Sequence, residues 1–145
     1  MKKILVAIDN SPRAPGVLAA ASELAARLGA KMILFRAVTI SEPLPEAWQA
    51  EETSYGDLLE RQGREEVAAL TRELEPKLVE RVRVEIGVPW EVICKAAREE
   101  DVDCIVIGSH GYGTLERMLG TTAAKVVNHA DRSVIVVRAG ERLAA

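Results

Sequence analysis

Glycine and hydroxyl residues are concentrated in one stretch of the chain, between residues 105 and 125. The stretch contains Gly108, Gly111, Gly113, Gly120, Ser109, Thr114, Thr121 and Thr122. Because ordered glycine costs backbone entropy, a folded protein that gathers it in one loop usually has a reason. Bare backbone N–H groups could surround a phosphate, or the glycines could only turn the chain and cap a helix. The spacing alone leaves both interpretations open, because isolated glycine patterns are weak signals.

The pattern on either side of the glycines favours an anion site. An apolar run ends at Ile107, and a helical run begins at Thr121 or Thr122. In open α/β sheets, ligands bind beyond the carboxyl ends of the strands. The start of a helix also presents free N–H groups and the positive end of its dipole. No P-loop lysine follows the glycines, and Arg117 is the cation within the loop. The stretch therefore predicts a phosphate-binding site of another kind.

A second candidate is Asp9, the polar residue that ends the first apolar run. Its carboxylate would repel phosphates directly. It would contribute by accepting hydrogen bonds from a ribose or a base, or by contacting a Mg²⁺ that the phosphates also hold. The alternative is structural: with Asn10 and Ser11, Asp9 would cap the first helix or its entry turn.

The remaining pattern alternates between strand-like and helix-like segments. Apolar runs predict strands at 3–9, 31–38, 82–86, 104–107 and 133–137, and helical spacing predicts helices at 12–29, 58–74, 89–100 and 121–130. Ser11 is the expected N-cap of the first helix, Gly29 its expected C-cap, and Pro76 the expected end of the second helix. Residues 39–57 break the rhythm and predict a long variable loop. This order predicts an α/β fold, an open doubly wound parallel sheet of five strands with helices on both faces.

The composition of the chain argues against two classes of partner, nucleic acid and membrane. The 145 residues suit a single domain, 1–145, and the net charge of −3 comes from mixed signs without a basic stripe. Nucleic acid is therefore not an expected partner. No apolar stretch approaches the roughly 18 residues of a membrane span, so we expect no membrane partner and a cytoplasmic location. Cys94 and Cys104 lie in apolar patterns and are expected to be packed, reduced thiols.

Three blocks of the sequence resemble the universal stress protein family: "KKILVAIDNS", "VPWEVICKAAREEDVDCIVIGSHGYG" and "LGTTAAKVVNHADRSVIVVR". They agree in order and spacing over nearly the whole chain except residues 39–57. The resemblance implies a fold that binds adenine nucleotides, with strand order 3-2-1-4-5, and a role in the stress response as a sensor or regulator. It also implies a homodimer joined through the last strand, Val134–Arg138, with regulatory protein partners that the sequence does not identify.

The family's nucleotide motif, GxxGx9G[ST], has a close counterpart here. Gly108 and Gly111 match its first pair, and Gly120 with Thr121 matches its end. The spacer departs from the motif, since eight residues, 112–119, separate Gly111 from Gly120. ATP, ADP and AMP therefore all remain candidate ligands, with Mg²⁺ near Asp9 as a possible companion of the phosphates.

Matching positions in the family imply a role for each candidate residue. Ala7 would line the purine slot, Asp9 would contact ribose or phosphate, and Ile107 would pack on the sugar or base. Ala37 and Val38 would meet the adenine partly through backbone groups. The residues implied to hold phosphates are Gly108, Ser109, Gly111, Gly120, Thr121 and Thr122, while His110 would orient the loop.

Other doubly wound proteins fit the residues less well. A phosphoacceptor receiver domain needs an acidic neighbour after its first strand, where this chain has Asn10 and Ser11. A pyrophosphatase-type adenylating enzyme would carry its glycines after the first strand, and a flavin carrier would need aromatic residues to stack on the ring. The open rival is a dimeric stress-response scaffold that binds no nucleotide and acts through protein partners. No residue is poised as a catalytic base, so at most slow ATP hydrolysis or self-phosphorylation is expected.

Overall fold

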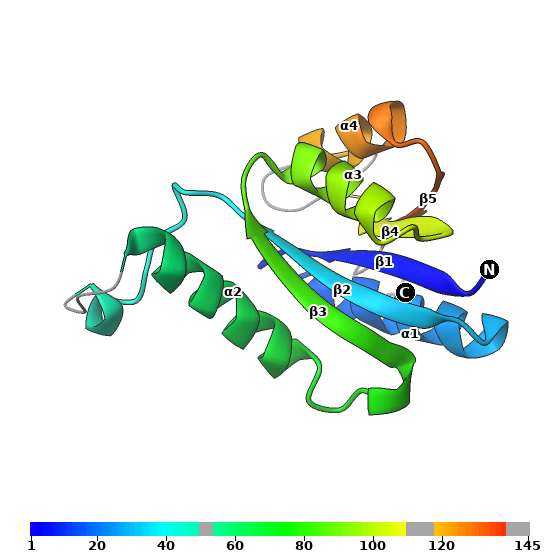
Figure 1. Ribbon diagram of the computed structural model, residues 1–145, viewed down its shortest axis with the longest axis horizontal. Coiled ribbons are helices and arrows are strands. Elements are labelled where there is room, and N and C mark those ends of the chain that lie inside the picture. Colours follow the sequence, from blue (N-terminus) through cyan, green and yellow to red (C-terminus); the bar gives the residue numbers. More distant parts are fainter. Residues whose placement is uncertain (50–53, 110–117, 139–145) are drawn as a thin grey trace.

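A computed structural model describes residues 1–49, 54–109 and 118–138, and these form one twisted parallel sheet with helices around it (Figure 1). The strands are β1 (Lys3–Ile8), β2 (Lys31–Val38), β3 (Val79–Ile86), β4 (Cys104–Gly108) and β5 (Ser133–Val137). Their order across the sheet is β3-β2-β1-β4-β5, and every neighbouring pair is parallel. The predicted fold class and strand order are therefore confirmed.

Helices cover both faces of the sheet (Figure 1). They are α1 (Ala14–Leu28), α2 (Tyr55–Leu70), α3 (Pro89–Glu99) and α4 (Thr121–His129), with short 3₁₀ turns η1 (Glu46–Trp48) and η2 (Pro76–Leu78). Successive side chains of a strand point to opposite faces. Ile4 and Val6 of β1 therefore pack in one cluster with α1, whereas Leu5 packs in a second cluster with α3 and α4. A third, smaller cluster lies under the first half of α2.

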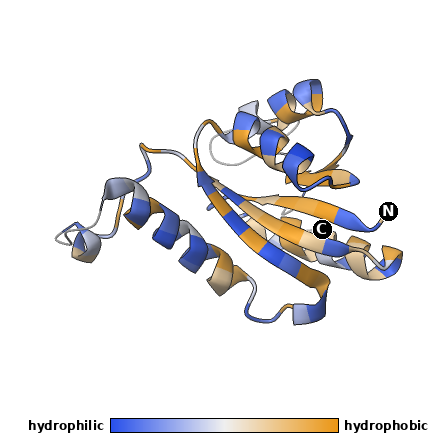
Figure 2. Cartoon of the chain, in the orientation of Figure 1, coloured by the Kyte–Doolittle hydropathy of each residue, from blue (hydrophilic) through white to orange (hydrophobic). Residues whose placement is uncertain are grey.

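The strands differ in hydropathy according to their place in the sheet (Figure 2). The central strand β1 is apolar from Ile4 to Ile8, and β2 is buried from Met32 to Val38. The edge strand β3 instead alternates apolar and charged residues from Val82 to Ile86, a pattern typical of a strand with one well-covered face.

The first helix begins later than expected. Helix α1 starts at Ala14, and its N-cap is Arg13, which makes no side-chain cap hydrogen bond. Ser11, the expected N-cap, lies in the turn before it, where its hydroxyl accepts a hydrogen bond from the amide of Arg13. The expected C-cap is confirmed: Gly29 adopts a left-handed conformation with φ of 66°, which glycine tolerates at no steric cost.

The described residues of the expected loop, 39–49 and 54–57, contain regular structure. They include η1 and the first residues of α2, and Leu44 is buried in the third cluster. Helix α2 ends at Leu70, well before Pro76, so that proline does not end the helix as expected. Leu74 still packs against the core beyond the helix, which explains why its apolar character imitated one more helical turn.

The two cysteines are buried and unpaired, as expected. Burial raises the pKa of the Cys94 and Cys104 thiols, which keeps both protonated and unreactive near neutral pH. Across the described ranges, no helix combines the length and the apolar character that crossing a bilayer requires.

Candidate functional site

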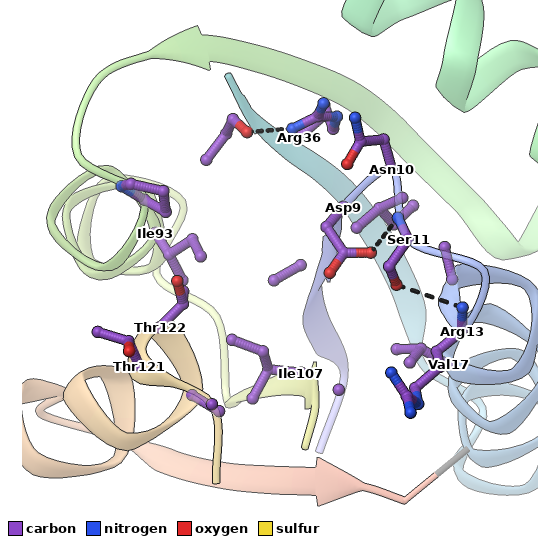
Figure 3. Close-up of a pocket in the computed structure, with 18 of the residues that line it drawn as sticks. Asp9, Asn10, Ser11, Arg13, Val17, Arg36, Ile93, Ile107, Thr121 and Thr122 are labelled. Carbon is purple, nitrogen blue, oxygen red and sulfur yellow. Dashed lines mark hydrogen bonds between the residues drawn. The ribbon is translucent and has the colours of Figure 1, made fainter. Parts of the chain in front are cut away.

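A cavity of about 390 Å³ opens at the carboxyl ends of β1 and β4 (Figure 3). These two strands are neighbours in the sheet, but β1 leads into the β2–β3 side and β4 into the β5 side. Such a reversal of strand order separates the loops on either side and leaves a crevice between them. The cavity therefore lies where a doubly wound sheet accepts ligands.

One wall of the cavity is the turn that links β1 to α1. The amide of Ser11 donates to Oδ1 of Asp9 at 2.9 Å, and the amide of Arg13 donates to Oγ of Ser11 at 3.2 Å (Figure 3). The first of these bonds agrees with the structural alternative for Asp9, a role in the entry turn of the helix. Asp9 is exposed and also lines the cavity, so its second carboxylate oxygen faces a space that a ligand could occupy.

The opposite wall is the start of α4, marked by Thr121 and Thr122 in Figure 3. Its N-cap is Gly120, which offers no side chain to cap the helix. The first amides of a helix have no carbonyl within the helix to bond. The amides of Thr121, Thr122 and Ala123, together with two threonine hydroxyls and the helix dipole, can therefore bind an anion.

Two other amides near the glycines are occupied within the protein. The amide of Gly120 donates to the carbonyl of Ser109 at 2.7 Å, and the amide of Ser109 donates to the carbonyl of Val137 at 2.8 Å. Both bonds hold the ends of the glycine stretch in place. They leave the first turn of α4 as the main described source of N–H groups for an anion.

Gly108 has a packing role of its own. A Cβ atom there would lie 2.9 Å from Cγ2 of Val17, closer than real Cβ contacts come. The missing side chain therefore lets α1 approach the end of β4. The glycine pattern that indicated an anion site thus contains one position that helix packing requires.

The far end of the cavity is polar and lies at the end of β2. Arg36, Thr39, Glu42 and Asn10 line it, next to the apolar side chain of Ala37. Arg36 is only 3% exposed, yet its guanidinium reaches Glu42, Glu66 and the carbonyl of Ala37. Between the two ends, Ile93 and Ile107 form an apolar floor with the small residue Ala7 (Figure 3).

Comparison with known proteins places this chain in a family. The model of the universal stress protein family matches residues 1–138. The chain belongs to the universal stress protein family.

Individual members agree with this assignment. A universal stress protein of Thermus aquaticus is 33% identical over 140 residues, which cover 94% of this chain and 98% of that protein. The structure of the universal stress protein UspA from Lactobacillus plantarum superposes with a TM-score of 0.73 at 25% identity, over 94% of this chain and 97% of the other. A universal stress protein solved in complex with cAMP has the same fold, with a TM-score of 0.68 and 24% identity over 96% of this chain and 98% of its own.

Most residues that the family motif implied lie around this one cavity. Those that line it are Ala7, Asp9, Ala37, Ile107, Gly108, Gly120, Thr121 and Thr122. Val38 does not line it: its side chain is buried in the cluster under α2, and its carbonyl accepts a hydrogen bond from the amide of Gly87. Ser109 is buried and does not line the cavity, and His110 and Gly111 lie outside the described residues.

Several lining residues were not expected from the universal stress protein motif. Arg13 and Arg36 bring two cations to the cavity, and Thr39, Glu42 and Ile93 are also among its lining residues. Arg36 had a signal in the sequence, because it is the one charge inside the otherwise apolar run from Met32 to Val38. Among the described residues, no three His, Cys, Asp or Glu side chains are grouped so that they could hold a metal ion.

Proposed function

We propose that this chain binds an adenine nucleotide in the cavity at the ends of β1 and β4. One observation carries the proposal: one cavity joins a helix start whose N-cap residue, Gly120, has no capping side chain to an apolar floor and a polar far end. The first feature suits phosphate, and the others suit a nucleoside. Its volume of about 390 Å³ lies within the usual range for small-molecule sites.

The orientation of the nucleotide follows from the chemistry of the two ends. Phosphates would bind the amides and hydroxyls at the start of α4, opposite Arg13 (Figure 3). The base would lie between Ala37, Ile93 and Ile107, and Asp9 would accept hydrogen bonds from the ribose. The fold neighbour solved with cAMP supports the choice of an adenosine phosphate, because it holds that class of ligand on the same architecture.

ATP, ADP and AMP differ in the length of the phosphate chain that the site would have to bind. Longer phosphate chains would extend from α4 toward Arg13 and Asp9, where a Mg²⁺ ion held by the phosphates could also meet the Asp9 carboxylate. We therefore propose ATP with Mg²⁺ as one candidate ligand, with ADP and AMP as the others.

At the level of the cell, we propose a cytoplasmic, homodimeric sensor or regulator of the stress response that acts on regulatory protein partners. The last strand, Val134–Arg138, is the proposed dimer contact. Within the described residues β5 forms an edge of the sheet, and all its apolar residues are only half-buried. Sedimentation velocity at several concentrations tests this assembly, and a monomer at all of them would contradict it.

The experiment that tests binding is calorimetric titration with AMP, ADP and ATP, the last with and without Mg²⁺. The informative variant is Thr121→Asp. Thr121 is exposed, and a carboxylate in the first turn of a helix is favourable for the helix but repels phosphate. We expect Thr121→Asp to fold at least as stably as the parent and to bind AMP at least about tenfold more weakly, a loss of about 1.4 kcal/mol.

Adenosine is the matched control, since it lacks the phosphate that the variant repels. Its affinity should be unchanged by Thr121→Asp. A wild-type protein that is well folded and gives no heat with any of the nucleotides would contradict the proposal and favour the scaffold that binds none.

A further inference from the structure

We propose that Glu42 is a positioning residue for the nucleoside end of the cavity and that Arg36 holds it in place. Glu42 would set the affinity for the nucleotide by fixing the wall formed by Asn10 and Thr39, without bonding the ligand itself. This inference rests on the proposed function, because it assigns the polar end of the cavity to the nucleoside.

The first observation is the burial of Arg36. Its side chain lies on the face of β2 that α2 covers, and its Cγ atom lies 3.5 Å from where a Cβ on Gly63 would be. A buried charge is tolerated only when it is paired and hydrogen-bonded. The guanidinium meets this need with Nε to Glu66 at 3.1 Å, one terminal nitrogen to Glu42 and the other to the carbonyl of Ala37.

The second observation is that one carboxylate joins three parts of the chain. Oε1 of Glu42 accepts from Arg36 in β2 and from the side-chain amide of Asn10, at 3.4 Å, in the β1–α1 turn. Oε2 accepts from the amide of Thr39 at 2.6 Å, at the start of the segment after β2. Asn10, Thr39 and Glu42 all line the cavity. The Glu42 carboxylate therefore fixes the positions of the residues that form the polar wall.

The third observation decides between contact and positioning. Each carboxylate oxygen of Glu42 already accepts two hydrogen bonds, the fourth from the Thr39 hydroxyl at 3.5 Å. A carboxylate has about four lone-pair sites, and the strongest bonds of Glu42, from Arg36 and the Thr39 amide, already take one site on each oxygen, with the longer contacts from Asn10 and the Thr39 hydroxyl beside them. Its effect on binding must therefore pass through the residues that it holds.

The described part of the segment after β2 is attached to the rest of the protein at further points. The Tyr55 hydroxyl donates to the carbonyl of Glu42 at 2.8 Å, and Leu44 is 7% exposed among apolar side chains of β2, β3 and α2. Trp48, farther along the segment, lies under the guanidinium of Arg61, which is 4.3 Å from the ring centroid. Trp48 is therefore a built-in reporter for the order of this segment.

Glu66 provides the matched control. It bonds the same guanidinium from α2, and among the described residues its other hydrogen-bond partner is Gln62, at 3.2 Å, in the same helix. Glu66 does not line the cavity. Glu42→Gln and Glu66→Gln thus remove the same charge from the same arginine, but only the first disturbs the wall.

The test compares the two variants by calorimetric titration with AMP and by their urea midpoints. We expect Glu42→Gln to weaken AMP binding at least about tenfold and Glu66→Gln by less than about twofold, at similar losses of stability. Inorganic pyrophosphate, which would use only the phosphate end, should bind all three proteins alike. Equal losses of AMP affinity in both variants, or none in either, would overturn the inference.

A second measurement needs no nucleotide. The variants are made in a Trp90→Phe background, which leaves Trp48 as the single tryptophan. Acrylamide should quench the fluorescence of Trp48 more strongly in the Glu42→Gln protein than in the Glu66→Gln protein. Equal quenching would contradict the positioning role even if AMP affinity changed. Absence of nucleotide binding by the wild-type protein would instead refute the proposed function, while the quenching result would still show whether Glu42 orders the segment.

Discussion

Two arginines in adjacent strands are surrounded by carboxylates, but they have different structural roles. Arg36 in β2 has a side chain 4% exposed and bonds Glu42 and Glu66. Arg83 in β3 is 22% exposed and meets Glu85 at 3.2 Å, Glu100 at 3.2 Å and Glu99. The first group lies between α2 and the cavity, whereas the second lies along the edge strand, where α3 approaches it.

The difference shows that the number of ion pairs matters less than where they are. Charged pairs near water gain little, because solvent screens them and long side chains lose freedom. A buried charge that loses its partner is costly. The Arg83 group keeps the edge strand polar and so opposes pairing with other chains, while the Arg36 group fixes the geometry of the cavity.

Replacing each arginine with methionine should give the largest difference in stability between the two groups. Arg36→Met should lower the free energy of unfolding by about 3 kcal/mol, because the half-buried carboxylates of Glu42 and Glu66 lose the cation that pairs with both. Arg83→Met should cost less than about 1 kcal/mol. Urea denaturation of both variants measures the difference. Equal losses would mean that burial does not separate the two groups.

A smaller contrast lies within α2, at the glycine beside Arg36. A Cβ on Gly63 would come within 2.9 Å of Val84 Cγ1 and 3.0 Å of Val38 Cγ2, so Gly63→Ala should push α2 from the sheet and cost about 1–2 kcal/mol. This loss already includes the better helix propensity of alanine.

Gly56 in the same helix is the control for that change. Of the described atoms, a Cβ there would meet Ile86 Cδ1 alone, at an ordinary 3.5 Å, so Gly56→Ala should leave stability unchanged or raise it by about 0.5 kcal/mol. Thermal melts of the pair provide the comparison. A Gly63→Ala protein as stable as Gly56→Ala would show that the close approach of α2 to Arg36 is not needed.

The smallest expected effect is the pH dependence of stability that comes from Glu99 in the Arg83 group. The hydrogen bond from Arg83 lowers the pKa of Glu99 below its ordinary value of 4.5. A carboxyl with a lowered folded-state pKa contributes stability above its unfolded pKa and loses it as the pH falls. Glu99→Gln should therefore be slightly less stable than the parent at neutral pH, and the two should converge below about pH 4 in melts across that range.

Salt provides the check on this last prediction. Exposed pairs are screened at high ionic strength, so the neutral-pH difference between Glu99→Gln and the parent should shrink in about 1 M salt. A difference that persists at high salt, or grows toward acid, would show that Glu99 acts through something other than its pairing with Arg83.

Local patterns were enough to predict most of the architecture. The apolar run of β2 matched the strand at both ends, because a strand buried on both faces reads as one continuous run. The start of β3 at Val79 was missed by three residues, since Glu80 and Arg81 of this edge strand are charged and exposed. Edge strands carry a weaker apolar signal, so their ends are decided by pairing with a neighbour.

The candidate site likewise has one part that the sequence predicted and another that only the folded structure decided. Residue types and spacing along the chain were sufficient for the fold class, while the family resemblance supplied the strand order and the full set of eight predicted residues that line the cavity. Only the folded chain brings Arg36 to Glu42, Asn10 to Glu42 and Gly108 to Val17. Periodicity reports which face a residue occupies within its own element. Which residue it meets from another element depends on how helices and strands pack, and that is a property of the assembled sheet.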